Sequence, residues 1–339
     1  MQKYQKILFV LILLVVVIFY FSRPGAEDVN VLIPKGLNAW QIADILADSG
    51  VIRHKTVFIA IGKITGWEKR IKPGLYTFKR GESEFRVFRS LVVGSGIHEL
   101  KVTIPEGKTL REIAEILGRT IGLDKERFLE LAYDERFIAD LMANYHIKPP
   151  KSLEGYLFPD TYLFFYAESE SAVIKRMVDR LFEVLDSNRI KRAKRLGLSV
   201  HKLLTLASIV EGEAAVDSER PIIAAVFWNR LRRRLPLESC ATVEYVLPKR
   251  KARLTSEDLK IDSPYNTYIH RGLPPGPICS PGKASIDAVL NPARVRYLYF
   301  VSKGDGTHLF AETYAQHIRN KRRVARLIRA KSAKEPSIS

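Results

Sequence analysis

Residues 203–213 read LLTLASIVEGE, a run whose apolar side chains leave almost no polar face before a glutamate arrives. At helical spacing, Leu204, Ser208 and Glu211 lie on one stripe. The run therefore predicts a buried helix with a carboxyl near its end. Removal from water would raise the pKa of that carboxyl, as a general acid near neutral pH requires. The alternative is that Glu211 emerges into solvent or pairs with a nearby arginine.

The composition is that of a globular protein. The chain has 339 residues, enough for two or three compact units, and 46% of them are hydrophobic. Lys and Arg number 55 against 37 Asp and Glu, which gives a net charge of +18 and indicates a polyanionic partner. The two cysteines, Cys240 and Cys279, form no CxxC pair, so we expect no zinc site, and we expect no cofactor.

The N-terminal residues predict the compartment. Lys3 and Lys6 precede an apolar run at 7–21, and no small-residue cleavage site follows closely. We expect an uncleaved signal anchor at 7–22, a cytoplasmic tail at 1–6, and export of the remaining chain. A cleaved signal peptide is the alternative. Export argues against nucleic acid as the polyanionic partner.

A strand–turn–helix pattern occurs twice in the first part of the chain. Residues 29–47 read VNVLIPKGLNAWQIADILA, and residues 101–117 read KVTIPEGKTLREIAEIL with matching apolar positions. Asn38 is suited to cap the first helix. The repeat predicts a small paired α+β module, with a further strand near 73–78 and a helix near 85–93. Pro149-Pro150 marks the expected domain boundary.

The remaining chain alternates helices with irregular segments. We expect a basic helix at 170–196, a helix capped by Asp217 or Ser218, a buried strand at 297–301 that forms a hairpin with 307–310, and a basic helix at 312–330. Residues 262–282 read DSPYNTYIHRGLPPGPICSPG. A Pro/Gly-rich segment of this length with many aromatic residues is typical of a functional loop.

Eight short motifs together resemble the endolytic murein transglycosylase (YceG-like) family. Each motif is weak alone, but all occur in the family's order: IPEG (104–107), LEGYLFPDTY (153–162), LASIVEGE (206–213), SERP (218–221), VFWNRL (226–231), SPYNTY (263–268), GLPPGPI (272–278) and YLYFV (297–301). The resemblance implies an α+β protein with a membrane anchor, a LysM-like module at 29–148, a mixed α+β catalytic domain at 149–330 and a disordered tail at 331–339.

The resemblance also implies a function. Family members are single-pass inner-membrane proteins with an extracytoplasmic catalytic domain. They cut nascent peptidoglycan glycan strands internally and are thought to end strand elongation beside the synthases. The family's catalytic glutamate maps onto Glu211. A lytic transglycosylase breaks the MurNAc–GlcNAc β-1,4 bond without water and leaves a 1,6-anhydro end, so one carboxyl can act as acid and then as base.

Two other functions stay open at this point. A hydrolytic muramidase needs a second carboxylate to position water, and Asp262 is the candidate. Glu213 points about 200° away from Glu211 on one helix, which favours an arginine partner for it. The third possibility is a scaffold that binds peptidoglycan without cleaving it.

Several further residues are candidates for contact with sugar. Tyr265, Asn266 and Tyr268 could stack on or hydrogen-bond to the glycan, although Asn266 could instead hold its own loop. Thr242, Glu213 and Glu154 complete the candidate substrate-binding set. For His308 and His317, which lie where the family also has histidines, we expect structural roles.

One segment departs from the family pattern. Many members read SDPTV where this chain has Ser239-Cys240-Ala241-Thr242-Val243, so no acidic role can be transferred to it. The replacement is a cysteine, and Cys279 lies in the GPICSPG segment. Two lone cysteines in an exported protein predict a Cys240–Cys279 disulfide.

Overall fold

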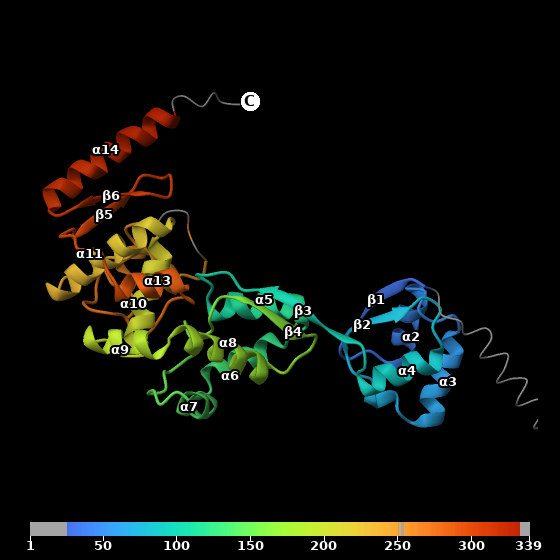
Figure 1. Ribbon diagram of the computed structural model, residues 1–339. Helices are drawn as coiled ribbons and strands as arrows, with labels where there is room; N and C mark the ends of the chain where they lie inside the picture. Colours follow the sequence, from blue (N-terminus) through green and yellow to red (C-terminus); the bar gives the residue numbers. More distant parts are fainter. Residues whose placement is uncertain (1–25, 250, 252–253, 333–339) are drawn as a thin grey trace, which may run out of the picture. The chain divides into compact units, whose positions relative to one another are not determined.

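The structure is a computed structural model that describes residues 26–249, 251 and 254–332 (Figure 1). It divides into two compact units. The N-terminal unit takes in the chain up to Val102 together with residues 117–123 and 162–169. The C-terminal unit takes in residues 103–116, 124–161 and the chain from Glu170 onward. Every residue discussed below as part of the candidate active site belongs to the C-terminal unit.

The N-terminal unit is built on a sheet with the strand order β1-β2-β3-β4. Its strands are β1 (Asp28–Ile33), β2 (Gly74–Lys79), β3 (Ile97–Thr103) and β4 (Thr161–Phe165). β1 and β2 pair antiparallel, with Val31 opposite Tyr76. Alternate residues of both strands face inward, and Val31, Ile33, Tyr76 and Phe78 are buried.

Three helices complete the core of this unit: α2 (Ala39–Asp48), α3 (Lys55–Thr65) and α4 (Glu84–Val93) (Figure 1). α2 begins at a capping box in which Asn38 and Gln41 bond each other's backbone N–H. Leu46, Phe58 and Phe88 fill the interior, and the two phenylalanine rings meet edge to face at 5.1 Å.

The C-terminal unit is mainly helical, and α10 (Val200–Glu213) lies at its centre. α10 packs against α11 (Arg220–Arg232), α12 (Cys240–Val246) and α13 (Lys283–Leu290) (Figure 1). The hairpin of β5 (Tyr299–Ser302) and β6 (His308–Ala311) lies beside the long helix α14 (Tyr314–Ser332). The other helices are α5 (Leu110–Ile121), α6 (Lys125–Tyr133), α7 (Glu135–Ala143), α8 (Glu170–Val184) and α9 (Ser187–Arg195), with short 3₁₀ turns at 68–70, 217–219 and 258–260.

The mixed α+β class is confirmed, and two expected elements need correction. The single basic helix expected at 170–196 is two helices, because Asp186 accepts a hydrogen bond from the Arg189 N–H and caps α9. The strand expected to be buried at 297–301 is half-buried. The hairpin itself and the irregular 262–282 loop lie where they were expected.

The division into units differs from the boundary expected at Pro149-Pro150. The first strand–turn–helix copy belongs to the N-terminal unit, whereas the turn of the second copy belongs to the C-terminal unit. Backbone hydrogen bonds hold that turn there: Gly107 N–H donates to the Ser280 carbonyl and Ser280 N–H donates to the Lys108 carbonyl. The strands of the two copies, β1 and β3, belong to one sheet, and the paired module stays a prediction. The LysM-like character of 29–148 stays a prediction.

The tail and anchor expected at 1–6 and 7–22 lie outside the described residues, as does most of the expected tail at 331–339. In the part of the chain that is described, no helix has both the length and the apolar character that crossing a bilayer requires.

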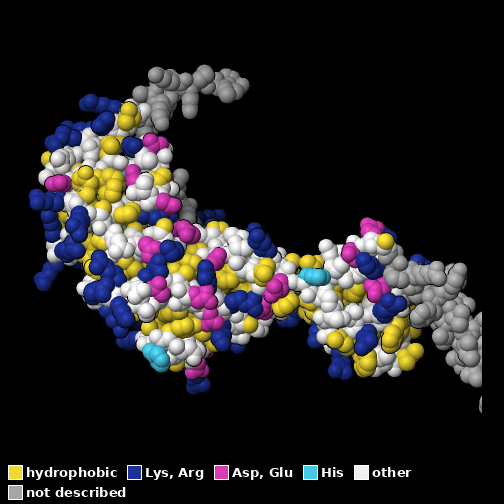
Figure 2. Space-filling model, viewed as in Figure 1, with side chains coloured by type: hydrophobic (Ala, Val, Ile, Leu, Met, Phe, Trp, Pro, Cys, Tyr) yellow, Lys and Arg dark blue, Asp and Glu magenta, His cyan; other side chains and the backbone are white. Residues whose placement is uncertain are grey.

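The excess positive charge gathers on the C-terminal unit. Lys and Arg side chains follow its outer edge over α9, α11 and α14 (Figure 2). The described part of α14 from Arg319 to Arg326 carries five basic residues and no acidic one. This surface suits an anionic partner.

Candidate active site

Helix α10 is buried over most of its length, and Glu211 lies near its C-terminal end at the edge of the core. Its N-cap Ser199 accepts a hydrogen bond from Lys202 N–H, and every residue from Leu203 to Val210 is buried. Ser208 lies on the stripe predicted to lead to Glu211, and its hydroxyl accepts a hydrogen bond from Ile278 N–H at 3.0 Å. The 262–282 loop is thereby fixed against the helix that presents Glu211.

The carboxyl of Glu211 is buried and both of its oxygens have partners. The side chain is 6% exposed. Oε1 accepts a hydrogen bond from Arg220 Nη1 at 2.9 Å, and Oε2 accepts one from the Gly282 backbone N–H at 2.9 Å. A guanidinium and a backbone amide thus fix the position of the carboxyl group. The predicted burial is confirmed, but the carboxyl pairs with an arginine, as the alternative interpretation held.

Arg220 is the centre of the charged groups at this site. It begins α11, next to Pro221 in the first turn, and its side chain is 8% exposed. Besides Glu211 it donates to Asp217 through Nε at 2.9 Å and to the hydroxyl of Ser285 at 2.5 Å. The planar guanidinium thus joins three chain segments, a role suited to the fixed donor geometry of arginine.

A second carboxyl, Glu106, lies beside this pair. Arg220 Nη2 is 3.8 Å from Glu106 Oε2, and the Glu106 side chain is 46% exposed. Burial and the charge of Glu211 raise the pKa of Glu106, Asp217 adds to the rise, and Arg220 opposes it. The site therefore contains two carboxyls that share one guanidinium and differ in exposure.

Glu106, Arg220 and Gly282 were missed as site residues when the sequence was read alone. Glu106 and Arg220 each lie in a motif that was recognised, IPEG and SERP, and each is the charged residue beside that motif's proline. A charged residue beside the proline of a recognised motif was therefore the feature of the sequence that could have identified Glu106 and Arg220 as site residues. Glu106 and Gly282 meet Glu211 through contacts between segments more than 60 residues apart, which spacing along the chain does not reveal, whereas Arg220 lies only nine residues after Glu211.

Glu213 has a structural role at the start of α12. Its Oε1 accepts a hydrogen bond from Ser239 Oγ at 2.6 Å and one from Ala241 N–H at 3.2 Å. A carboxylate at this position satisfies N-terminal amides of a helix. Neither the arginine partner expected for Glu213 nor a sugar contact agrees with this arrangement.

Asn266 holds its own loop, as the alternative interpretation held. The side chain is fully buried, and Nδ2 donates to the carbonyls of Leu259 and Ile261 at 3.0 and 2.9 Å. Oδ1 accepts from Tyr268 N–H at 3.0 Å. The expected contact of Asn266 with sugar is therefore not supported, whereas Tyr265 and Tyr268 are only half-buried.

We expect Asn266→Ala to destabilise the protein. The change leaves two buried carbonyls and one amide without their side-chain partner, and each such loss costs about 1–3 kcal/mol. Urea unfolding followed by fluorescence measures the loss. Asp262→Ala, in the same loop with a side chain 99% exposed, is the control and should leave the unfolding midpoint unchanged. Equal midpoints for wild type and Asn266→Ala would contradict the assigned role.

Glu154 is a buried carboxyl in a different part of the unit. It is 3% exposed, accepts hydrogen bonds from Leu110 N–H at 3.1 Å and from the Tyr245 hydroxyl at 3.3 Å, and thereby caps α5. Burial raises its pKa to about 7, although the bonds from Leu110, Tyr245 and Gly155 oppose the rise; the charge of Glu112 adds to it. Such burial does not suit the expected direct contact with sugar.

The stability of the protein should fall as Glu154 ionises. Its folded-state pKa lies above the ordinary value, so folding favours the protonated form and the cost of ionisation appears between about pH 4.5 and 7. Wild type should lose about 3 kcal/mol relative to Glu154→Gln between pH 4.5 and 8. Urea unfolding of both proteins at these two pH values measures the difference. Parallel stability curves would show that Glu154 does not titrate in this range.

Thr242, Cys240 and Cys279 each contact a different group in the structure. Thr242 is fully buried, and its hydroxyl donates to the Ser239 carbonyl, so the expected sugar contact is not supported. Both cysteines are free thiols. Cys240 Sγ lies 3.2 Å from the Tyr268 hydroxyl, whereas Cys279 Sγ lies 3.5 Å from the Ser208 carbonyl. The expected Cys240–Cys279 disulfide is absent from the structure because each thiol packs against a different segment.

His308, His317 and Asp262 have partners other than Glu211 and Arg220. His308 Nδ1 is 2.7 Å from Glu219 Oε2, a contact that ties β6 to the turn before α11. His317 stacks on Tyr299 with ring centroids 5.2 Å apart, and burial lowers its pKa. Asp262 has His270 as a partner at 3.9 Å. The structural roles expected for the two histidines agree with these contacts.

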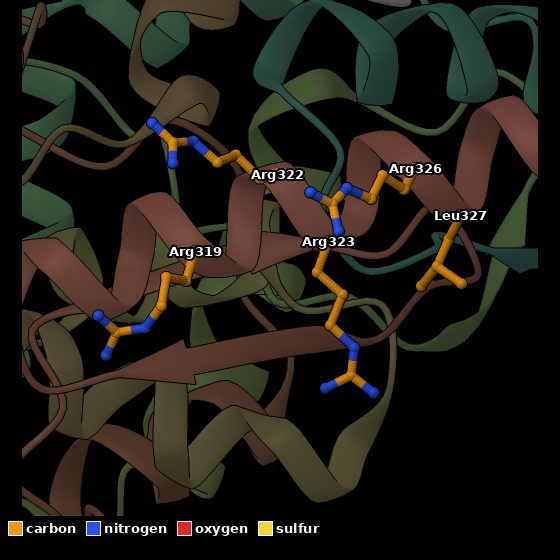
Figure 3. A pocket seen from close by; sticks show the side chains of 5 residues that line it. All are labelled: Arg319, Arg322, Arg323, Arg326 and Leu327. Carbon is orange, nitrogen blue, oxygen red and sulfur yellow. The ribbon is translucent and has the colours of Figure 1, made fainter.

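A surface hollow of about 580 Å³ on α14 is a different feature from this site. Arg319, Arg322, Arg323, Arg326 and Leu327 line it. The four guanidinium groups point in different directions, not toward one point (Figure 3). None of the residues around Glu211 lines this hollow.

Comparison with known proteins gives consistent matches over nearly the whole chain. The model of the YceG-like family matches residues 31–323. The endolytic murein transglycosylase of Bacillus subtilis is 35% identical over 308 residues, which cover 87% of this chain and 84% of that protein. That of Streptococcus pneumoniae is 34% identical over 322 residues, covering 86% of this chain and 57% of the longer relative.

A solved structure shows the same fold. The crystal structure of a yceG-like protein from Listeria monocytogenes has a TM-score of 0.63 and 34% sequence identity with this chain. The match covers 86% of this chain and 98% of that one.

Proposed function

Since this chain belongs to the YceG-like family, we propose that it is a lytic transglycosylase that cleaves peptidoglycan glycan strands internally. One structural observation supports this proposal independently of the family match. Glu211 lies at the end of a buried helix with both carboxyl oxygens held, by Arg220 and by the Gly282 amide. A carboxyl fixed in this way suits acid–base catalysis, which needs a group held in a defined position.

The proposed reaction uses Glu211 twice. In its protonated form Glu211 donates its proton to the glycosidic oxygen as the bond from C1 of MurNAc to that oxygen breaks. The ionised carboxylate then accepts the proton of the substrate's C6 hydroxyl as that oxygen bonds to C1. The products are a GlcNAc hydroxyl end and a 1,6-anhydroMurNAc end, and the proton returns to Glu211. Water takes no part.

Hydrolysis is the second candidate, because the site contains another carboxyl. A muramidase needs a group that positions water or binds the sugar cation. The residue expected for that role, Asp262, is almost fully exposed with His270 as its partner, whereas Glu106 shares Arg220 with Glu211. Glu106 therefore replaces Asp262 as the second carboxylate of a hydrolytic reaction.

Product masses distinguish these reactions. Purified glycan strands are incubated with the full chain, the fragments are separated, and the mass of each fragment is measured by mass spectrometry. Internal fragments lighter by one water support the transglycosylase. Fragments with ordinary reducing ends would identify a muramidase, and intact strands that bind to the protein would identify a scaffold.

The proposal includes a location and a physiological role. The apolar run at 7–21 behind Lys3 and Lys6 supports a single membrane anchor with the catalytic unit outside the cytoplasm. There the enzyme would meet nascent strands beside a peptidoglycan synthase and end their elongation, and the LysM-like part would bind glycan. Protease treatment of intact spheroplasts tests the location: the C-terminal unit should be degraded while a cytoplasmic marker survives.

A further inference from the structure

One helix of the N-terminal unit, α3, is apolar on both of its sides. The inner side packs into the core through Phe58, Ile59 and Gly62, which are buried. The outer side carries a second apolar stripe at the spacing i, i+3, i+4 and i+7, here named the α3 stripe and formed by Val57, Ala60, Ile61 and Ile64. Hydrophobic side chains gather on the surface of this unit where α3 and α4 lie (Figure 2).

The α3 stripe is exposed to solvent. Ile64 is 85% exposed and Val57 is 46% exposed. Ala60 is exposed as well, and Ile61 is half-buried. Trp67, which follows the end of the helix, adds a ring that is 38% exposed. A single exposed apolar side chain is ordinary, but several on one face of a helix indicate a surface that binds a partner.

The charges around the stripe indicate an anionic partner. Segment 55–70 contains four basic residues and one acidic residue, and Lys63, Lys69 and Arg70 are exposed. The guanidinium carbon of Arg70 lies 6.0 Å from the centroid of the Trp67 ring. An apolar helix face with neighbouring cations and a tryptophan at its end is typical of a helix that lies in the interface of an anionic bilayer.

The chain enters this unit beside the start of α3. Residues 23–27 link the expected anchor to β1, a link that spans about 20 Å when fully extended. Glu27 accepts a hydrogen bond from Arg80 Nε at 2.7 Å, and Gly81 N–H donates to the carbonyl of Gly50, which shortly precedes α3. An anchor in the bilayer therefore keeps the N-terminal unit at the membrane surface, with the start of α3 near the point of attachment.

We propose that the α3 stripe docks onto the surface of the bilayer that holds the anchor. The inference rests on the membrane location proposed above and adds lipid as a direct partner of the N-terminal unit. The stripe contacts the boundary between headgroups and acyl chains, Trp67 lies at the level of the headgroups, and the exposed basic side chains meet anionic lipid. Because the anchor tethers the unit to the bilayer, a contact of modest strength is sufficient for docking.

Lipids that carry a quencher test this docking in the full chain. The protein carries Cys240→Ser, which removes the exposed thiol, while Cys279 is buried and is not labelled. One fluorophore is attached at Ile64→Cys or, in a second protein, at Asn30→Cys. Each protein is reconstituted in vesicles of phosphatidylcholine and phosphatidylglycerol, with and without spin-labelled lipid. The spin label should quench the Ile64→Cys probe and leave the Asn30→Cys probe unquenched.

Asn30 is the matched control because it is exposed on the same unit but on a different face. Its neighbours on β1, Val31 and Ile33, are buried in the core under the helices. Side chains of a strand alternate between its two faces, so Asn30 points away from the helices. The two probes therefore share the anchor, the unit and the bilayer, and differ only in the surface they report.

Ile64→Glu tests the stripe itself, with the fluorophore at Val57→Cys. Ile64 is so exposed that the change leaves the core intact, but a carboxylate enters the apolar boundary of a bilayer only at high cost. The ratio of docked to free protein should fall at least about tenfold. Thr56→Glu places the same charge on an exposed residue of α3 outside the stripe and should keep most of the quenching. Thermal melting checks that both variants are folded.

Each result decides the inference. Lipid quenching confined to the Ile64→Cys probe, and lost from the Val57→Cys probe with Ile64→Glu, supports it. Equal quenching of the Ile64→Cys and Asn30→Cys probes, or quenching of neither, overturns it. An Ile64→Cys probe that is shielded from aqueous iodide without lipid quenching also overturns it, because a second copy or another protein then covers the stripe.

The same samples keep this inference separate from the proposed function. A full chain that does not float with the vesicles contradicts the proposed anchor and overturns the docking with it. Glycan cleavage is measured in parallel, so cleavage without lipid quenching overturns the docking and leaves the proposed transglycosylase intact. Lipid quenching without cleavage under any condition contradicts the proposed reaction and supports the docking.

Discussion

Glu211→Gln should abolish glycan cleavage while the protein stays folded. Glutamine keeps the size and hydrogen-bonding shape of glutamic acid but cannot give up or accept the proton that the reaction moves. Loss of a general acid–base group lowers rates about 10²–10⁴-fold, and one group serves both steps here, so we expect a loss at or beyond the upper end. Mass spectrometry of glycan fragments, at equal protein concentrations, measures the loss.

A matched control separates the chemistry from general effects of losing a carboxylate. Glu183 on α8 is exposed and pairs with Arg180, so Glu183→Gln should cleave as wild type does. The unfolding midpoint of Glu211→Gln must also be compared with that of wild type, because a Gln side chain meets Arg220 without a negative charge. Substantial cleavage by a folded Glu211→Gln protein would contradict the assignment of the acid.

Arg220→Met should have the largest effect on stability. Methionine is close to arginine in length but leaves the Glu211 carboxylate buried with only the Gly282 amide as partner. Breaking a buried ion pair by removing one partner costs about 3–5 kcal/mol, because the remaining charge is uncompensated. The change also removes the bonds to Asp217 and Ser285. Urea unfolding measures the free energy of unfolding.

A second change at the same position separates the charge of Arg220 from its hydrogen-bond geometry. Arg220→Lys retains a positive charge but cannot bond three groups in fixed directions, and we expect an intermediate loss. A loss for Arg220→Lys as large as that for Arg220→Met would show that the positive charge at this position does not contribute to stability.

Local chemistry accounts for what could be predicted about the candidate site. The carboxyl at the end of an apolar run was visible in residues 203–213, and its burial follows from helical periodicity, which is a property of neighbouring residues. The cap of α2 by Asn38 and the hairpin of β5 and β6 were predicted for the same reason. The role of Asn266 was left open, since an amide can serve a loop or a ligand equally well.

Predictions that depended on distant contacts succeeded less often. The disulfide was inferred from two cysteines without knowledge of the surfaces they face, and each thiol in the structure has its own partner. The sugar contacts expected for Thr242 and Glu154 were inferred from motif membership, but both side chains are buried. Motif membership shows that a residue matters without showing whether it serves the core or the ligand.

The sequence by itself determined the α+β class, the helix that carries Glu211 and the order of the motifs, because these depend on periodicity, caps and turns within short segments. Only the tertiary structure decided what surrounds the Glu211 carboxyl. Glu106, Arg220 and Gly282 come from three separate segments. Backbone hydrogen bonds between residues far apart in the chain bring them together. The protonation of a buried acid depends on such neighbours, and spacing along the chain does not encode them.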